Sequence, residues 1–83
     1  MDFQVSRKVI GCAMRVHSTL GCGFLESLYE HAMAIELQRK GIPFQRQVNY
    51  RVHYRHEKIG MYTADLVVED SLILELKALN SLN

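Results

Sequence analysis

The sequence predicts a small α+β domain in which two helices precede an antiparallel sheet of three strands. Apolar residues recur at helical spacing through the first half of the chain, and from Gln47 onward they alternate with polar residues. The chain has 83 residues, enough for one domain, and 48% of them are hydrophobic, which excludes a chain disordered by composition. We therefore expect residues 1–83 to form a single domain.

The first predicted helix runs from Phe3 to about Leu20. Its apolar stripe contains Val5, Val9, Ala13, Val16 and Leu20. Gly21 and Gly23 follow, and glycine permits the tight turn that ends a helix.

The second predicted helix runs from about Leu25 to Lys40. Its apolar stripe contains Leu25, Leu28, Ala32 and Ile35. Gly41 ends this helix, and Pro43 prevents any continuation.

Three strands are predicted in the second half. The first starts at Gln47 and places Val48, Tyr50, Val52 and Tyr54 on one face. A polar turn near His56 and Glu57 leads to a second strand over Ile59 to Val68. The third, Leu72 to Leu79, is almost continuously apolar, which indicates a central strand buried on both faces.

The loop between the last two strands determines which side chains meet. If Glu69-Asp70-Ser71 is a three-residue loop, Val68 faces Leu72, Val67 faces Ile73, and Asp65 faces Glu75 with Cβ atoms about 4.5–5.5 Å apart. A two-residue loop would put the two acids on opposite faces. The apolar pattern allows both; we favour the longer loop because it gathers the polar side chains on one face.

Asp65 and Glu75 are candidate ligands for a divalent metal. Two facing carboxylates repel each other, and a hard cation such as Mg²⁺ or Mn²⁺ removes that repulsion. Lys77 shares a strand face with Glu75, where it could orient an attacking water or stabilise charge developing on a phosphoryl group. The alternative is an ordinary salt bridge on a solvated sheet face, and the local spacing does not separate the two.

Three motifs extend this interpretation: Gly23-Phe24-Leu25-Glu26-Ser27-Leu28-Tyr29, Tyr62-Thr63-Ala64-Asp65-Leu66-Val67-Val68-Glu69 and Leu74-Glu75-Leu76-Lys77-Ala78. In this order they resemble the GxxExxY protein family of the PD-(D/E)XK nuclease superfamily, over nearly the whole chain. The resemblance implies a metal-dependent nuclease, with Asp65 and Glu75 as metal-binding acids and the carbonyl of Leu76 as a further ligand. It implies that Lys77 is the catalytic lysine and that Glu26 completes the acidic cluster. Tyr29 is expected to be a packing residue with a hydrogen-bonded hydroxyl.

The sequence departs from the family pattern in two places. Cys22 stands in a turn where relatives usually have proline. The family core normally continues beyond the lysine strand with a helix and a strand, whereas this chain stops at Asn83. We therefore expect the last helix and strand of the core to be missing. The sheet would keep an uncovered edge, which a second copy or another partner could cover.

The charges are unevenly distributed. Residues 39–58 hold six of the ten Lys and Arg residues and one acid, Glu57. Arg51, Arg55 and Lys58 are candidate contacts to nucleic-acid phosphates, although plain solvation explains them equally well. Tyr50 and Tyr54 lie on the strand face opposite to that of Arg51, and we expect them to pack in the core.

Three functions follow from these features: a magnesium-dependent nuclease acting on DNA or RNA, a non-catalytic nucleic-acid-binding module, and a protein-interaction module that keeps the nuclease fold. Cys12 and Cys22 lack zinc-site spacing and are too few for a disulfide framework, so free thiols are expected. No run approaches the ~18 apolar residues of a membrane span, and no signal pattern starts the chain. We expect a cytoplasmic protein without a membrane partner.

Overall fold

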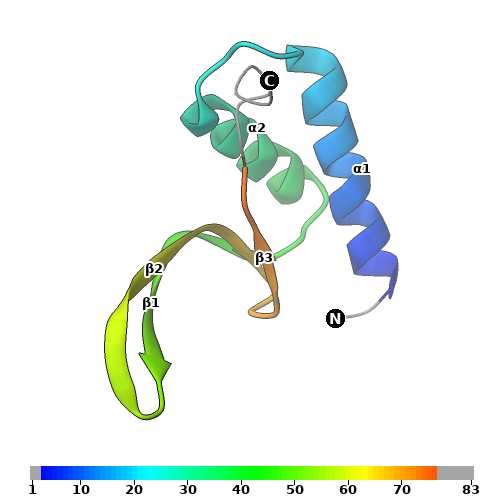
Figure 1. The fold of residues 1–83 in the computed structure, drawn as a ribbon. Helices are drawn as coiled ribbons and strands as arrows, with labels where there is room; N and C mark the ends of the chain where they lie inside the picture. The colour runs from blue at the N-terminus through cyan, green and yellow to red at the C-terminus, as the bar shows by residue number, and fades with distance from the viewer. Residues whose placement is uncertain (1–2, 77–83) are drawn as a thin grey trace.

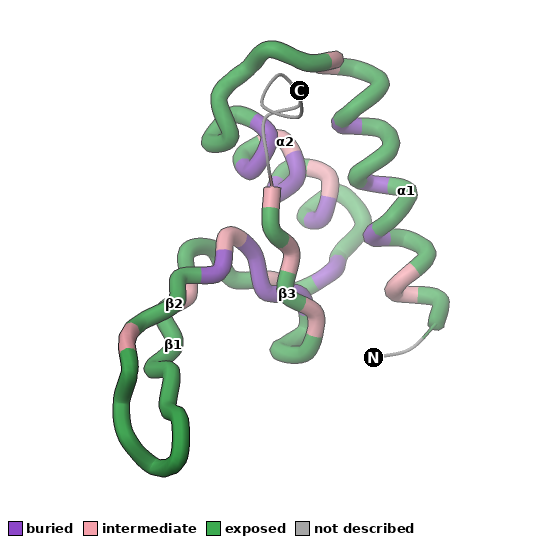
Figure 2. The backbone as a smooth tube through the Cα atoms, in the orientation of Figure 1, coloured by how far each residue is buried: buried purple, intermediate pink, exposed green. Residues whose placement is uncertain are grey.

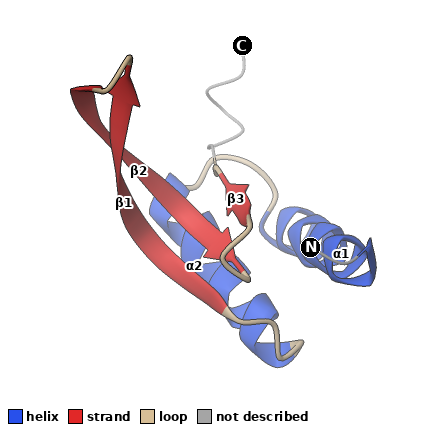
Figure 3. Ribbon diagram, turned by 90° about the horizontal axis from the view of Figure 1, so that it is seen from below, coloured by secondary structure: helices blue, strands red, loops and turns tan. Residues whose placement is uncertain are grey.

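The computed structural model describes residues 3–76, which form the predicted α+β fold (Figure 1). In chain order the elements are α1 (Phe3–Leu20), α2 (Glu26–Arg39), β1 (Phe44–Tyr54), β2 (Glu57–Val68) and β3 (Leu72–Leu74). The strands form one antiparallel sheet in the order β1-β2-β3. Helix α2 lies against the sheet, and α1 packs beside α2 (Figures 1 and 3).

The bounds of the helices agree with the prediction, and those of the first two strands differ from it slightly. Helix α1 has the predicted ends, whereas Leu25 and Lys40 are the caps of α2 rather than part of it. Strand β1 begins three residues early, at Phe44, because residues 44–46 pair with the apolar end of β2. Strand β2 begins at Glu57 because the turn is formed by residues 55–56, both with positive φ, as in a two-residue hairpin turn.

The hydrophobic core lies between the two helices and the base of the sheet. Its buried members are Val9, Cys12, Val16, Tyr29, Met33, Leu37, Ile42, Leu66 and Val68. Figure 2 shows the buried segments gathered on the helices and on the part of β2 nearest to them. The core therefore joins α1, α2 and the base of the sheet into one unit.

The face that α2 turns to the core differs from the predicted one. Leu25, Leu28 and Ile35 are exposed, at 73%, 47% and 47% of their surface. The buried face contains Tyr29, Glu30, Met33, Ala34 and Leu37. Apolar residues lie on more than one side of this helix, so its sequence offers two candidate stripes. The stripe with Tyr29, Met33 and Leu37 at one-turn spacing is the one that packs against the core. In α1, similarly, Cys12 is buried and the expected Ala13 is exposed.

The far half of the β1–β2 hairpin extends beyond the helices, and we call residues 48–63 the arm (Figure 1). Its residues are exposed or only partly buried (Figure 2). Tyr50 and Tyr54, expected in the core, are 37% and 63% exposed because no helix lies beneath them. The Tyr50 ring stacks on that of Tyr62, with centroids 6.4 Å apart. In the arm, the alternation of polar and apolar residues therefore does not separate a buried face from a solvated face.

Strand β3 pairs as predicted but is shorter than predicted. Val68 lies opposite Leu72, and Val67 lies opposite Ile73, so the loop of three residues is confirmed. The ladder ends where Leu66 meets Leu74; residues 75–76 follow without strand geometry, and residues 77–79 of the predicted strand lie outside the described part. Among residues 3–76, β3 is an edge strand rather than a central one, and Ile73 is 45% exposed.

Two smaller expectations can also be compared with the fold. Cys12 and Cys22 are both free thiols, the first buried and the second exposed. Over the described range, 3–76, neither helix is long and apolar enough to cross a bilayer.

Candidate functional site

One cavity joins the start of α2 to the sheet. It has a volume of about 360 Å³ and is lined by Glu26, Ser27, Glu30, Gln47 and Asp65. Glu26 and Glu30 lie one turn apart on α2, so their side chains project from the same side of the helix. The cavity therefore gathers three carboxylates that come from distant parts of the sequence.

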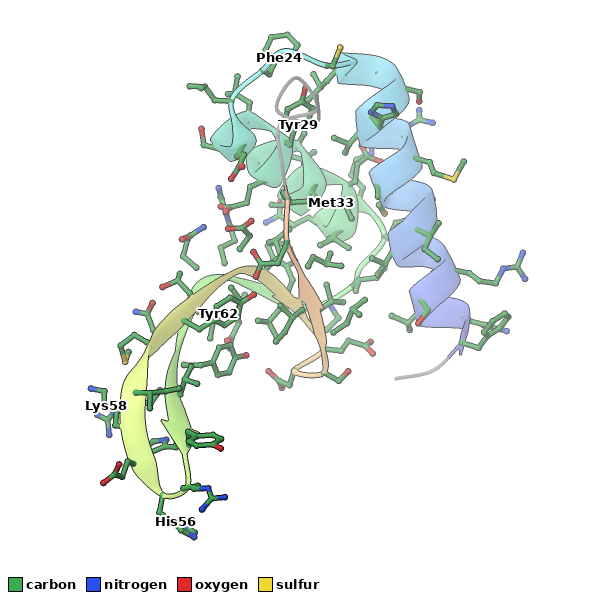
Figure 4. The ribbon with its side chains drawn as sticks, in the orientation of Figure 1. Phe24, Tyr29, Met33, His56, Lys58 and Tyr62 are labelled. Atoms are coloured by element: carbon green, nitrogen blue, oxygen red, sulfur yellow. The ribbon has the colours of Figure 1, made fainter. Side chains whose placement is uncertain are left out.

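Tyr29 connects α2 to the turn that precedes it. Its hydroxyl donates a hydrogen bond of 2.7 Å to the carbonyl of Gly21 and accepts one of 3.3 Å from the N–H of Phe24. The Phe24 and Tyr29 rings meet edge to face, with centroids 6.3 Å apart (Figure 4). Tyr29 is 6% exposed, so it is the packing residue with a hydrogen-bonded hydroxyl that the sequence predicts. These hydrogen bonds hold the turn that precedes Glu26, the first residue of α2.

Glu30 is the buried charge of the site, with a side chain only 9% exposed. Its Oε2 atom accepts a hydrogen bond of 2.9 Å from Nε of Arg46 and forms an ion pair of 2.9 Å with a terminal nitrogen of the same guanidinium. Its Oε1 atom accepts a hydrogen bond from the amide of Gln47. A buried carboxylate needs such partners, because burial removes the water that would otherwise stabilise its charge. Both oxygens of Glu30 are therefore already occupied by donors.

Asp65 connects β2 to the segment after β3. Its Oδ2 atom accepts a hydrogen bond of 2.9 Å from the backbone N–H of Leu76, and its Oδ1 atom lies 3.5 Å from Nε2 of Gln47. These two contacts hold the carboxylate of Asp65 from two sides. The residue is partly buried and still borders the cavity.

The predicted site residues are brought together only in part. Glu26 and Asp65 border the same cavity, and Leu76 contacts Asp65 through its N–H. Glu75 is exposed, and neither Glu75 nor Leu76, the described residues after β3, lines this cavity. The alternation that would place Glu75 opposite Asp65 is interrupted because the ladder ends at Leu74. Lys77 lies outside the described residues.

The donor atoms at this cavity have the chemistry that Mg²⁺ or Mn²⁺ requires, because both cations prefer carboxylate and carbonyl oxygens. Glu26 and Asp65 supply such oxygens at the cavity. Glu30 is less suited to bind a cation, because the adjacent Arg46 guanidinium already compensates its charge. Within residues 3–76, no three side chains of His, Cys, Asp or Glu are arranged to hold a metal ion.

Three members of this network were not predicted from the sequence: Glu30, Arg46 and Gln47. The signal for Glu30 was its spacing of four residues from Glu26, which puts both acids on one side of α2. Gln47 gave no signal, because its part in the site depends on a left-handed backbone with φ of 52°.

The predicted nucleic-acid contacts lie on the arm. Arg51, Arg55 and Lys58 are all exposed, and Lys58 projects from the arm near its tip (Figure 4). The Arg55 guanidinium lies 5.9 Å from the ring centroid of Tyr54, which holds it against the arm. These cations come from a different part of the fold than the carboxylates of the cavity.

Comparison with protein families identifies a relationship for nearly the whole chain. A family model described as the PD-(D/E)XK nuclease superfamily matches residues 3–83. The matched range includes every described helix and strand and all residues that line the cavity. No curated protein and no solved structure matches the chain significantly.

Proposed function

Because this chain belongs to the PD-(D/E)XK nuclease superfamily, we propose that it hydrolyses phosphodiester bonds of DNA or RNA with Mg²⁺ or Mn²⁺ as its cofactor. The position of Asp65 is the main structural support for this proposal. Asp65 borders a cavity shared with Glu26, and its hydrogen bond to Leu76 brings the segment that carries Glu75 close to β2. The two acids expected to bind the cation thus belong to connected segments.

Asp65 and Glu75 would hold the cation, with the carbonyl of Leu76 as a further ligand and Glu26 as the supporting acid of α2. A bound divalent cation supplies a water of lowered pKa and offsets negative charge on the leaving oxygen. The ammonium of Lys77 would stabilise the charge that develops on the phosphoryl oxygens. Tyr29 takes no part in this chemistry, because its hydroxyl is used in the turn before α2.

The arm would bind the substrate backbone. The carboxylates at the cavity repel a polyanion, so binding requires cations elsewhere on the protein. Arg51, Arg55 and Lys58 provide three positive charges on an exposed hairpin that contains one acid, Glu57. We therefore assign the phosphate contacts to the arm and the reaction to the cavity.

A cleavage assay tests the proposed reaction. The chain is incubated with Mg²⁺ or Mn²⁺ and with double-stranded DNA, single-stranded DNA or RNA, and the products are separated by size. We expect cleavage of at least one substrate, lost with EDTA and in Asp65→Asn and Glu75→Gln. Asp70→Asn is the matched control, because it removes an exposed carboxylate in the β2–β3 turn. Cleavage that survives both Asp65→Asn and Glu75→Gln would contradict the proposal.

A second function, a non-catalytic module that binds nucleic acid or a protein, is favoured by the arm. Tyr54, Ile59 and Met61 are 63%, 66% and 56% exposed, and such apolar side chains beside cations suit a binding surface. This function predicts binding without cleavage. Binding would then be unaffected by EDTA and by Glu75→Gln, but weakened by substitutions in the arm.

A further inference from the structure

The backbone of Gln47 differs from the strand around it. Its neighbours pair regularly with β2, Arg46 opposite Leu66 and Val48 opposite Ala64, which leaves Gln47 beside Asp65. Gln47 itself has a φ of 52°, in the left-handed region that residues other than glycine rarely adopt.

Four other non-glycine residues among those described have positive φ, and their setting is different. They are Arg55, His56, Glu69 and Asp70. All four lie in the two hairpin turns, where left-handed backbone is routine. Gln47 has this conformation inside a strand, where no turn requires it. Such a conformation persists only when surrounding contacts compensate for it, and it is often found at functional sites.

The contacts of the Gln47 side chain supply that compensation. Its amide donates to Oε1 of Glu30 and lies 3.5 Å from Oδ1 of Asp65, so one NH₂ group lies between two carboxylates. Glu30 is held in place at its other oxygen, because Arg46 contacts Oε2 through one hydrogen bond and one ion pair. The buried Glu30 carboxylate, held by Arg46, therefore fixes Gln47, and Gln47 in turn faces Asp65.

We infer that Gln47, anchored by Glu30, is a positioning residue that sets the orientation of the Asp65 carboxylate at the cavity. With the Leu76 N–H on Oδ2 and the Gln47 amide near Oδ1, Asp65 has a donor on each oxygen. The reason for such positioning rests on the proposed function, because Asp65 must be correctly oriented to bind a divalent cation. Groups of this kind change metal affinity without contacting the metal.

Two substitutions separate positioning from folding. Gln47→Gly removes the amide and relieves the left-handed backbone, so the fold should be kept. Gln47→Asn keeps an amide and a residue that tolerates left-handed φ, but its side chain is one methylene too short to reach both carboxylates. Asp70→Gly is the control, because it relieves a positive φ of 60° in a turn and leaves the cavity residues unchanged.

Amide hydrogen exchange of the whole chain without metal is the first measurement. If Gln47 positions Asp65, exchange of the Leu76 N–H should be about 3- to 10-fold faster in Gln47→Gly and Gln47→Asn than in the wild type or Asp70→Gly. Amides in the middle of β2 should not change. Unchanged protection of Leu76 in both variants would overturn the inference.

Calorimetric titration with Mn²⁺ is the second measurement. We expect the dissociation constant to rise about 10- to 100-fold in Gln47→Gly, with no change in Asp70→Gly. An unchanged constant in Gln47→Gly would also overturn the inference. Absence of Mn²⁺ binding by the wild type would instead contradict the proposed function, and the exchange of Leu76 would then decide the positioning role alone.

Discussion

The backbone N–H of Leu76 donates a hydrogen bond of 2.9 Å to Oδ2 of Asp65. This bond forms beyond the last backbone pair of the β2–β3 ladder, Leu66 with Leu74. A side chain of β2 thus holds the segment that follows β3 after the backbone pairing of the two strands has ended. The two acidic motifs of the sequence are joined through this contact rather than by continued strand pairing.

Loss of the Arg46 side chain should destabilise the fold. Arg46→Leu leaves the buried Glu30 carboxylate without its cation, and we expect the free energy of unfolding to fall by about 1–3 kcal/mol. Arg46 is 42% exposed, so water can replace part of the lost interaction. Arg15→Leu is the matched control, because its 3.7 Å pair with Glu36 is exposed on the arginine side and should contribute less than about 1 kcal/mol. Urea unfolding of the two variants tests the difference, and equal losses would contradict it.

The hydroxyl of Tyr29 should stabilise the turn between the helices. Tyr29→Phe removes the bond to the Gly21 carbonyl and the acceptor for the Phe24 N–H, which should cost about 1–2 kcal/mol. Tyr54→Phe, at a residue 63% exposed on the arm, should leave the stability unchanged. The midpoints of urea unfolding provide the comparison. A Tyr29→Phe variant as stable as the wild type would show that the hydroxyl does not fasten this turn.

The thiol of Cys12 should make the stability depend on alkaline pH. Burial, and secondly the nearby Glu36 carboxylate, raise the pKa of Cys12 above its ordinary value of 9.0, against an opposing effect of Lys40. The folded state therefore releases this proton less readily than the unfolded state. Its contribution to stability is complete below pH 9.0 and is lost as the pH rises toward the folded pKa.

Unfolding by urea between pH 7 and pH 10.5 checks this dependence. Cys12→Ala should lose stability less steeply than the wild type above about pH 9, whereas Cys22→Ala, at an exposed thiol, should follow the wild type. All three proteins contain the same lysines and tyrosines, so the pH dependence that these residues contribute to stability cancels in the comparison. Parallel curves for Cys12→Ala and the wild type would rule out the proposed role of this thiol.

The cations of the arm should determine how binding depends on salt. Arg51→Gln, Arg55→Gln and Lys58→Gln should each weaken binding to nucleic acid and reduce the slope of log K against log salt by about 1. Lys8→Gln, on α1, removes an exposed cation outside the arm and should leave the slope unchanged. Fluorescence anisotropy with a labelled oligonucleotide measures these slopes. A slope that falls equally in Lys8→Gln would assign the effect to net charge rather than to the arm.

The order of elements could be predicted from the sequence because its signals are local. Gly21 and Gly23 mark one turn, Gly41 and Pro43 mark the next, and their effects on the backbone require no tertiary contact. The buried face of α2 and the exposure of the arm could not be predicted in this way. Both depend on which elements lie nearby, and an alternating strand is the same in sequence whether or not a helix covers it.

The candidate site was predictable to a similar extent. Asp65 and Glu26 follow from motifs, and the structure has both at one cavity. The anchor formed by Glu30, Arg46 and Gln47 escaped prediction because it depends on one left-handed residue inside β1. Sequence periodicity predicts ordinary strand geometry at Gln47. It therefore gives no indication that the side chain of Gln47 connects Glu30 to Asp65.

The most direct test of the central claim is calorimetric titration of Mn²⁺ and Mg²⁺ into the chain, its Asp65→Asn and Glu75→Gln variants, and the Asp70→Asn control. The proposed function predicts saturable binding by the wild type and the control, and loss of binding in the other two variants. Absence of binding by the wild type, or equal binding by all four proteins, would contradict the claim that Asp65 and Glu75 hold a catalytic cation.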